Sequence, residues 1–319
     1  MKKKIIVLSV SILIVSTFLI WVKYQGDMQV SYDRVQGKSS IIATSYGNLE
    51  YTEGGVGPDV LVIHGGGGGY DQGELLARTV LGEKFRCITP SRFGYLGSSL
   101  PEGATYDDQA HAYAKLLDHL KVERAAVIGF SAGGPSALLF ALLHPDRVSS
   151  LTLISAGATN VSEQAGKQGI KQGKMLSNLM QRDFPYWVSV NLFKKQIMQL
   201  MGANKEVIAT LSQEQIKVMD QVIDYMNPAA LRKSGAAFDH YAALPNERIA
   251  GIRTPTLVVH AEDDTLQPYQ NAVFTSSTIP GARLLSFENG GHFAVAIEQS
   301  TISREVYKHI SNAEFETEE

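Results

Sequence analysis

The sequence has a single cysteine, Cys87, among its 319 residues. One thiol cannot close an intrachain disulfide or build a zinc or iron–sulfur site from cysteines. The chain also lacks an excess of positive charge, because 29 Lys and Arg residues stand against 32 Asp and Glu residues and leave a formal charge of −3. Without a basic field to hold a phosphate backbone, nucleic acid is not expected as a partner. At 44% hydrophobic residues the composition excludes disorder and allows a large buried core.

The chain begins with a basic and then an apolar segment. Three lysines at positions 2–4 precede Ile5–Val22, which contains no charged side chain. A helix over this stretch would span about 27 Å, which just crosses a bilayer. No small-residue cleavage site follows, which favours an uncleaved anchor over residues 1–27 rather than a secreted protein. The lysines are expected to stay in the cytoplasm, so the rest of the chain would be extracytoplasmic. Tyr24–Lys38 is polar and predicts a spacer.

Short apolar runs rich in Val, Ile and Leu predict strands. The runs are Ile41–Thr44, Leu49–Thr52, Val60–Ile63, Arg86–Thr89, Ala125–Ile128, Leu151–Ile154, Thr256–Val259 and Leu284–Phe287. Helical patterns cover Tyr106–Leu120, Ala132–Leu143 and Ala294–Ile310. Strands that alternate with helices build a parallel sheet, so the predicted fold class is α/β.

The alternation of strands and helices stops after Ser155 and resumes at Thr256. We assign residues 159–250 to a helical insert, a cap or lid, and residues 28–158 and 251–319 to the core. Six of the eight methionines lie in the insert: Met175, Met180, Met198, Met201, Met219 and Met226. Methionine adapts to irregular apolar surfaces, so these side chains are expected either to line an adaptable pocket or simply to fill a helical core.

A pentapeptide at the end of one predicted strand carries the first chemical signal. Gly129-Phe130-Ser131-Ala132-Gly133 follows a strand directly and opens a helix directly, which is the context of the G-x-S-x-G motif. A serine on so sharp a turn is strained, and side chains two residues away on either side would collide. Ser131 is therefore predicted to be a nucleophile. The alternative is a small residue at an ordinary helix N-terminus.

A serine nucleophile needs a base within hydrogen-bond reach and a carboxylate to orient that base. Among the eight histidines, His292 follows a turn, Asn289-Gly290-Gly291, directly after the last predicted strand. Strand ends are where open α/β sheets place their chemistry. Asp263 and Asp264 follow another buried strand, so the order along the chain is Ser, Asp, His.

That order is the one found in α/β-hydrolases, and from about Ile41 to Ile310 the chain resembles a capped member of this superfamily. The resemblance rests on the glycine-rich run Ile63–Gly69, on Ser91–Ser98, on the Ser131 turn, on the Asp264 loop and on Gly291-His292. It implies an α/β-hydrolase fold with a mostly parallel central sheet. It also implies Asp264 as the acid, with Asp263 as the runner-up, because Ala261 stands where relatives usually have glycine.

The oxygen of an attacked carbonyl becomes negative, and backbone N–H groups that point at it stabilise it. Ala132, the residue after the nucleophile, is expected to supply one such group. The resemblance points to Gly66 for the second, with Gly67 as a neighbour that could replace it. The glycine run is not expected to bind a nucleotide, because no Lys-Ser or Lys-Thr pair follows it and Asp71 and Glu74 would repel phosphate.

The predicted reaction is hydrolysis of a small, largely apolar carboxylic ester through an acyl-enzyme on Ser131, without a metal or an organic cofactor. One alternative is an aminopeptidase of the proline iminopeptidase type, which would need an acidic pair in the insert. Candidates for that pair are Glu163, Glu206 and Glu214. A second alternative is a non-catalytic receptor for a small ligand, because a fold does not dictate function.

Overall fold

The computed structural model describes residues 2–159, 163–203 and 205–315. Its strands form a single sheet in the order β1-β2-β4-β3-β5-β6-β7-β8. Their bounds are β1 Ser40–Thr44, β2 Gly47–Gly54, β3 Asp59–Ile63, β4 Arg86–Pro90, β5 Ala125–Phe130, β6 Val148–Ile154, β7 Thr256–Ala261 and β8 Arg283–Phe287. The pairs β1–β2 and β2–β4 are antiparallel and the other pairs are parallel. The predicted α/β class with a mostly parallel sheet is therefore confirmed.

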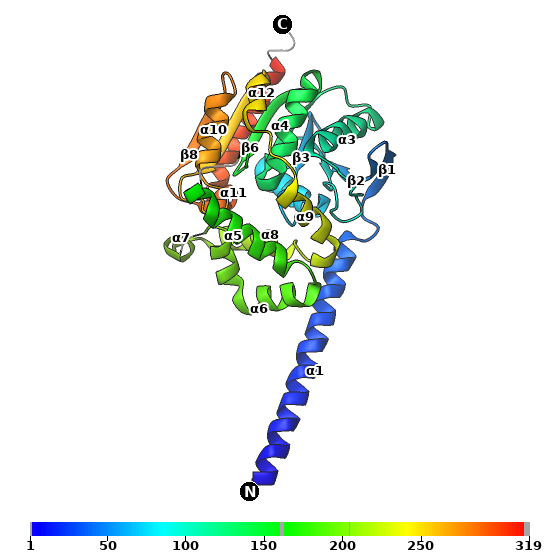
Figure 1. Ribbon diagram of the computed structural model, residues 1–319, viewed down its shortest axis with the longest axis vertical. Coiled ribbons are helices and arrows are strands. Elements are labelled where there is room, and N and C mark those ends of the chain that lie inside the picture. The colour runs from blue at the N-terminus through cyan, green and yellow to red at the C-terminus, as the bar shows by residue number, and fades with distance from the viewer. Residues whose placement is uncertain (1, 160–162, 204, 316–319) are drawn as a thin grey trace.

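Helices cover both faces of the sheet (Figure 1). The core helices are α2 Tyr70–Leu81, α3 Tyr106–His119, α4 Gly134–Leu143, α10 Gln270–Thr278, α11 Ala294–Ile297 and α12 Gln299–Phe315. Side chains of α2 and α12 belong to one hydrophobic cluster, and those of α3, α4 and α10 belong to the other. Strands β5, β6 and β7 are buried along their whole length between these layers, which explains their continuous apolar runs.

The insert between β6 and β7 folds into helices α5 to α9. Their bounds are α5 Glu163–Leu179, α6 Asp183–Leu200, α7 Lys205–Thr210, α8 Gln213–Asp224 and α9 Lys233–Tyr241. We refer to α5–α9 as the cap. In Figure 1 these helices lie together at the end of the sheet that the carboxyl ends of β3, β5, β6 and β7 face.

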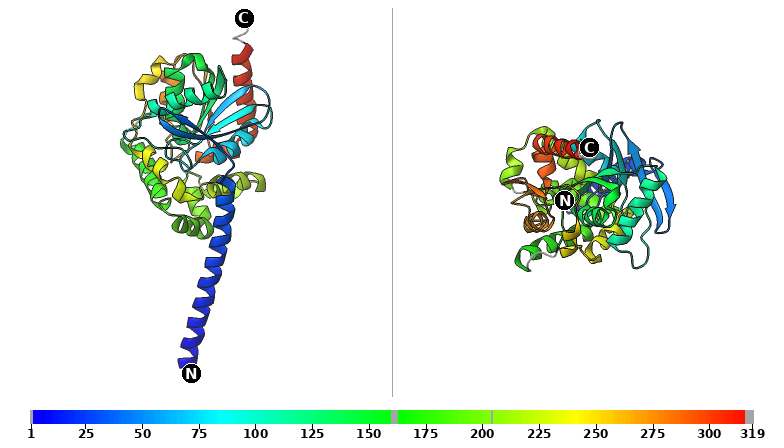
Figure 2. Two further views of the ribbon diagram at one scale, coloured as in Figure 1. Left: turned by 90° about the vertical axis from the view of Figure 1, so that its right-hand side faces the viewer. Right: turned by 90° about the horizontal axis from the view of Figure 1, so that it is seen from above.

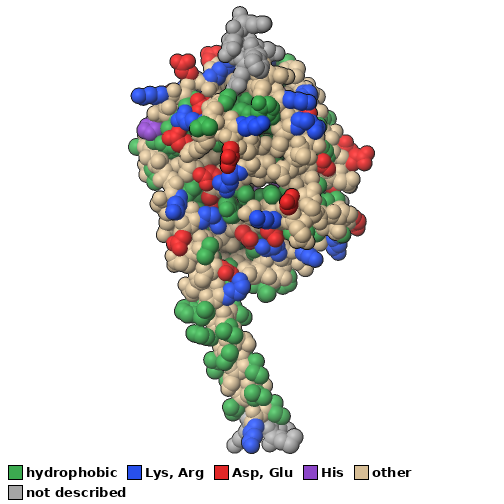
Figure 3. All heavy atoms as spheres, turned by 180° about the vertical axis from the view of Figure 1, so that it is seen from behind, with side chains coloured by type: hydrophobic (Ala, Val, Ile, Leu, Met, Phe, Trp, Pro, Cys, Tyr) green, Lys and Arg blue, Asp and Glu red, His purple; other side chains and the backbone are tan. Residues whose placement is uncertain are grey.

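The N-terminal helix α1 (Lys2–Val35) leaves the body as one straight rod, and the two chain termini lie at opposite ends of the molecule (Figures 1 and 2). On the face seen in Figure 3, its protruding part carries hydrophobic side chains along its length, whereas the surface of the body is mixed. The helix has a mean hydropathy of 2.8 in its most apolar window, with nothing of that window buried. By length and composition α1 can cross a membrane.

The prediction of a polar spacer over Tyr24–Lys38 is wrong. Helix α1 continues to Val35 and packs against the body, where Met28, Ser31 and Val35 are buried. These residues and Tyr24 recur at helical spacing and form a narrow stripe on one side of α1. Polar residues between them hide the stripe in the sequence.

Candidate active site

Ser131 occupies the sharp turn between β5 and α4. Its φ angle is +48°, in the left-handed region that a residue with a side chain rarely adopts. A Cβ atom on Gly129 would lie 2.7 Å from the Cβ of Ala137, and one on Gly133 would lie 2.5 Å from the carbonyl oxygen of His64. Both positions therefore require glycine for the chain to turn so tightly. The turn holds the Ser131 hydroxyl out from the end of the strand.

The structure brings Ser131, His292 and Asp264 together from three different loops. The Nε2 atom of His292 lies 2.8 Å from the Ser131 Oγ, and its Nδ1 atom lies 2.8 Å from the Asp264 Oδ2. Because an ionised carboxylate only accepts hydrogen bonds, Nδ1 carries the proton and Nε2 is left to accept from the serine hydroxyl. A hydroxyl placed in this way can be deprotonated as it attacks an electrophile.

Asp264 is buried and fully hydrogen-bonded. Its Oδ1 atom accepts from the backbone N–H groups of Leu266 and Gln267, both at 2.9 Å. Burial alone would raise the pKa of the Asp264 carboxyl, but His292 and His260 hold this pKa well below its ordinary value. The neighbouring carboxylate of Asp263 points elsewhere and accepts from the N–H of Gly291 at 2.7 Å. Of the two acids left open by the sequence, Asp264 is the one beside His292.

The glycine loop, residues 64–69, lies against the Ser131 turn. A Cβ atom on Gly66 would sit 3.7 Å from the Cβ of Ala132, so these two backbones are neighbours. Gly67 has φ +71°, and its N–H already donates to the hydroxyl of Tyr95 at 3.3 Å. The N–H of Gly67 is thus already bonded within the protein, although Gly66, Gly67 and Ala132 all line the cavity beside Ser131.

Arg92 braces the glycine loop from behind, a role that the sequence analysis missed. The fully buried guanidinium donates to the carbonyl oxygens of His64 and Gly65 at 3.0 and 3.1 Å, and to both oxygens of Asp239 in α9 at 2.6 and 2.7 Å. The hydroxyl of Tyr95 donates to the same carboxylate at 2.5 Å. The signal in the sequence was a charged residue two positions after the end of β4 (Arg86–Pro90).

His64 is part of this brace. Its Nε2 atom accepts from the backbone N–H of Arg92 at 2.9 Å, and its Nδ1 atom lies 2.7 Å from the Gly65 carbonyl oxygen. Burial and the Arg92 guanidinium hold the pKa of His64 well below its ordinary value. The ring is therefore neutral and fixes the loop through two hydrogen bonds.

A second buried charge cluster joins the glycine loop to the cap and to α1. The Asp71 carboxylate, in the first turn of α2, accepts hydrogen bonds from Nη1 and Nη2 of Arg232 at 3.1 and 2.8 Å and from Nε of Arg34 at 3.0 Å. The Nη1 atom of Arg232 also donates to the carbonyl oxygen of Gly68 at 2.5 Å. Although burial opposes the charge, the two guanidinium groups lower the pKa of Asp71.

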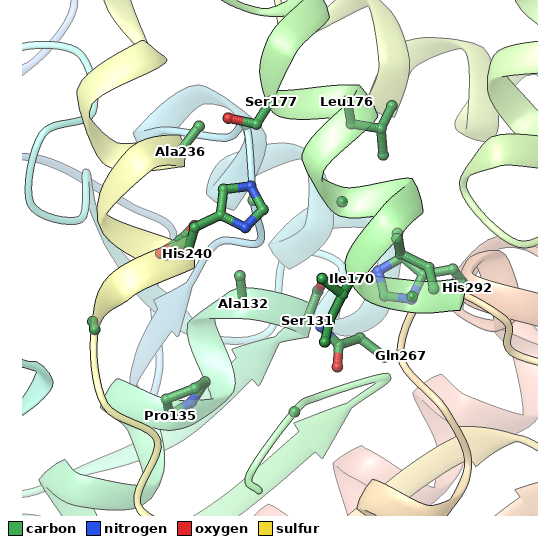
Figure 4. Close-up of a pocket in the computed structure, with 18 of the residues that line it drawn as sticks. Ser131, Ala132, Pro135, Ile170, Leu176, Ser177, Ala236, His240, Gln267 and His292 are labelled. Carbon is green, nitrogen blue, oxygen red and sulfur yellow. Dashed lines mark hydrogen bonds between the residues drawn. The ribbon is translucent and has the colours of Figure 1, made fainter. Parts of the chain in front are cut away.

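Two cavities of unequal size meet at Ser131 and His292. The larger has a volume of about 390 Å³ and lies under the cap, with Ile170, Leu176 and Ser177 of α5 and Ala236 and His240 of α9 facing it (Figure 4). Of the six methionines of the insert, Met180, Met201 and Met226 line it. The smaller cavity has a volume of about 60 Å³ and is lined mainly by apolar side chains, together with Gln72 and Ser155.

The comparison with known proteins agrees with this architecture. The model of the alpha/beta hydrolase fold family matches residues 58–298. An uncharacterized hydrolase of Bacillus subtilis (strain 168), YcgS, is 31% identical over 77% of this chain and 88% of its own. The 2-hydroxy-6-oxo-6-phenylhexa-2,4-dienoate hydrolase of Comamonas testosteroni is 26% identical over 77% of this chain and 85% of its own.

A solved structure supports the same assignment. The alpha/beta hydrolase fold protein from Nakamurella multipartita has a TM-score of 0.63 and 25% identity, and the match covers 85% of this chain and 98% of that chain. The relatives named above are hydrolases, and the resemblance inferred from the motifs is confirmed. The chain belongs to the alpha/beta hydrolase fold family.

Proposed function

We propose that the protein is a serine hydrolase that cleaves a small carboxylic ester. The observation that carries the proposal is the unbroken hydrogen-bonded chain from Ser131 through His292 to Asp264, which opens into a cavity beside Gly66 and Ala132. These are the parts that acyl transfer requires: an activated nucleophile, an oriented base, and two backbone N–H groups next to the reacting carbon.

In the proposed reaction His292 Nε2 accepts the hydroxyl proton as Ser131 Oγ attacks the ester carbonyl carbon. The carbonyl oxygen becomes an oxyanion and accepts hydrogen bonds from the N–H groups of Gly66 and Ala132. The C–O bond to the alcohol then breaks, and the alcohol leaves with the proton from His292. A water molecule, deprotonated by His292, next attacks the acyl-enzyme, and collapse of the second tetrahedral intermediate releases the acid and restores the serine. Asp264 orients the imidazole throughout.

The two cavities support an ester with unequal halves. The cavity of about 60 Å³ has room for only a short group, whereas the cavity of about 390 Å³ accepts a larger and mainly apolar one. We assign the short acyl group to the smaller cavity and the alcohol to the larger one. Three methionines around the larger cavity allow it to adapt to alcohols of different shape.

The charges around the cavity favour an ester over a substrate with a free amino group. Asp239 lines the larger cavity, but its carboxylate is neutralised by Arg92 and accepts from Tyr95. Glu206 and Glu214 are exposed and do not line the cavity, and the side chain of Glu163 lies outside the described residues. No unpaired carboxylate among the described lining residues is available to bind an amine.

We further propose that α1 anchors the protein in a membrane with the body on the extracytoplasmic side. No described residue covers the most apolar window of α1, and the three lysines at positions 2–4 match the cytoplasmic end of such a helix. Resistance of the full chain to alkaline carbonate extraction, together with an intact N-terminus by mass spectrometry, tests this against secretion after signal cleavage.

The activity is tested with the full chain in detergent, on p-nitrophenyl esters of increasing acyl length and on aminoacyl p-nitroanilides. We expect turnover of short-chain esters that is lost in Ser131→Ala. Turnover of the anilides alone would refute the proposed esterase activity and favour an aminopeptidase. A folded protein that turns over neither series would refute the general esterase and favour a receptor.

A further inference from the structure

Helix α6 lies on the underside of the cap, beside the point where α1 leaves the body (Figure 1). It exposes three large apolar side chains, because Phe184 is 47%, Leu192 69% and Phe193 50% exposed. Other positions of α6, among them Tyr186 and Val190, are buried in the cap, and the backbone of α6 is kinked at Phe193. Large apolar side chains that gather on one surface mark a site that another apolar body covers.

Contacts with α1 fix the height of α6 along that helix. Trp187 Nε1 donates to Asp27 Oδ2 at 2.8 Å, and the ring of Tyr24 packs edge-on against the Trp187 ring at a centroid distance of 5.4 Å. Further along α6, Asn191 Oδ1 accepts from Lys23 Nζ at 2.9 Å. The same ammonium group also pairs with Asp27, so Asn191 lies between the levels of Lys23 and Asp27, and Leu192 and Phe193 follow it directly.

Lys23 is the first charged residue after the apolar stretch Ile5–Val22. When that stretch fills the hydrocarbon core, Lys23 stands at its boundary, and the headgroup layer extends about 5–7 Å further out. Asp27 is one helical turn beyond Lys23, a rise of about 6 Å. The segment of α6 from Trp187 to Phe193 is thus held within the thickness of the headgroup layer.

We propose that α6 rests in the headgroup layer of the bilayer that holds α1, with Phe184, Leu192 and Phe193 inserted among the lipids. This inference rests on the proposed membrane anchor. Lys195 is exposed close to the inserted residues and supplies positive charge toward lipid phosphates. The cap is then fixed to the membrane along α6 as well as through its contacts with α1.

The experiment places a fluorescent probe on α6 in the full chain. Cys87→Ala removes the single native thiol, and Leu192→Cys then carries an environment-sensitive NBD label in vesicles of phosphatidylcholine and phosphatidylglycerol. Val56→Cys is the matched control, because Val56 is 78% exposed and precedes β3, at the end of the sheet away from the cap. We expect a blue-shifted emission that nitroxide lipids quench for Leu192→Cys and for Phe184→Cys, but not for Val56→Cys.

Flotation and carbonate extraction of the same vesicles monitor the anchor separately. Protein that carbonate removes would refute the anchor and α6 insertion together. Protein that stays bound while the probe at position 192 behaves like the one at position 56 would overturn the α6 proposal alone. A blue shift that grows with the protein-to-lipid ratio and resists nitroxide lipids would show that a second copy of the chain covers α6, which also overturns the proposal.

Discussion

Asp71 offers the sharpest test of how the body is held together. Its buried carboxylate faces two guanidinium groups, that of Arg232, which is fully buried, and that of Arg34, which is mostly buried. Asp71→Asn keeps the shape but leaves both cations without their counter-charge. Removing one partner of a buried ion pair costs about 3–5 kcal/mol. For a domain of this size we expect the melting temperature to fall by about 6–20 °C.

The assay is thermal unfolding of the full chain in detergent, with Asp118→Asn as the matched control. Asp118 makes the same kind of ion pair with Arg147 at 2.7 Å, but its side chain is 51% exposed, so its loss should cost no more than about 1 kcal/mol. Arg34→Met should fall between the two, at about 1.5–3 kcal/mol, because Asp71 keeps Arg232. An Asp71→Asn melting temperature equal to that of Asp118→Asn would refute the reasoning.

The pH dependence of the Asp71 effect gives a second check. The two guanidinium groups, working against burial, lower the pKa of Asp71 in the folded state. A group with a lowered folded pKa stabilises the protein above its unfolded pKa of about 3.9 and loses that contribution as the pH falls through the folded value. The difference in stability between the wild type and Asp71→Asn should therefore be full at pH 7 and shrink below about pH 4. A difference that does not change with pH would argue against the charge as its source.

Three further predictions concern activity. Asp264→Asn should lower kcat about 10⁴-fold, because the imidazole loses its orientation. Asp263→Asn keeps the acceptor for the Gly291 N–H and should change kcat little. Equal effects of the two variants in steady-state kinetics would show that Asp264 is not the acid. Tyr95→Phe removes the acceptor for the Gly67 N–H and should lower kcat by up to about tenfold with KM nearly unchanged. An effect on KM alone would instead place Tyr95 in substrate binding. Met226→Ala should move the optimum toward bulkier alcohols in a series of acetate esters, and an unchanged optimum would show that the alcohol does not reach this side chain.

The parts of the fold that could be predicted from the sequence are those encoded by adjacent residues. Each apolar run became a strand within a few positions of its predicted bounds. For β5, β6 and β7 the signal is clear because a strand buried on both faces must be apolar throughout. Helix α2 was missed, and Gly73 shows why. A Cβ atom there would lie 3.1 Å from the Cβ of Thr89, so close packing on β4 favours glycine, a residue that is poor in isolated helices.

The supporting network of the site could not be predicted, because its partners are far apart in the sequence. Arg92 meets Asp239 across 147 positions, Asp71 meets Arg232 across 161, and Arg34 meets Asp71 across 37. No local pattern links such residues, whereas Ser131 lies in a motif between a strand and a helix and His292 follows a glycine turn, and both signals are visible in the sequence. The sequence thus predicts the side chains proposed to react, while the charges that hold them are established only by the fold.

The continuity of α1 gives these charges a further consequence. A polar spacer would have let the body tumble above the membrane, but α1 is one helix from its apolar stretch to Val35. Arg34, in the last turn of α1, donates a hydrogen bond to Asp71. Asp71 also binds Arg232, which in turn donates to the carbonyl oxygen of Gly68 in the glycine loop. A stiff helix that ends in a buried ion cluster transmits orientation as well as attachment. In an α1-anchored protein, the direction in which the cavity opens is therefore set relative to the bilayer.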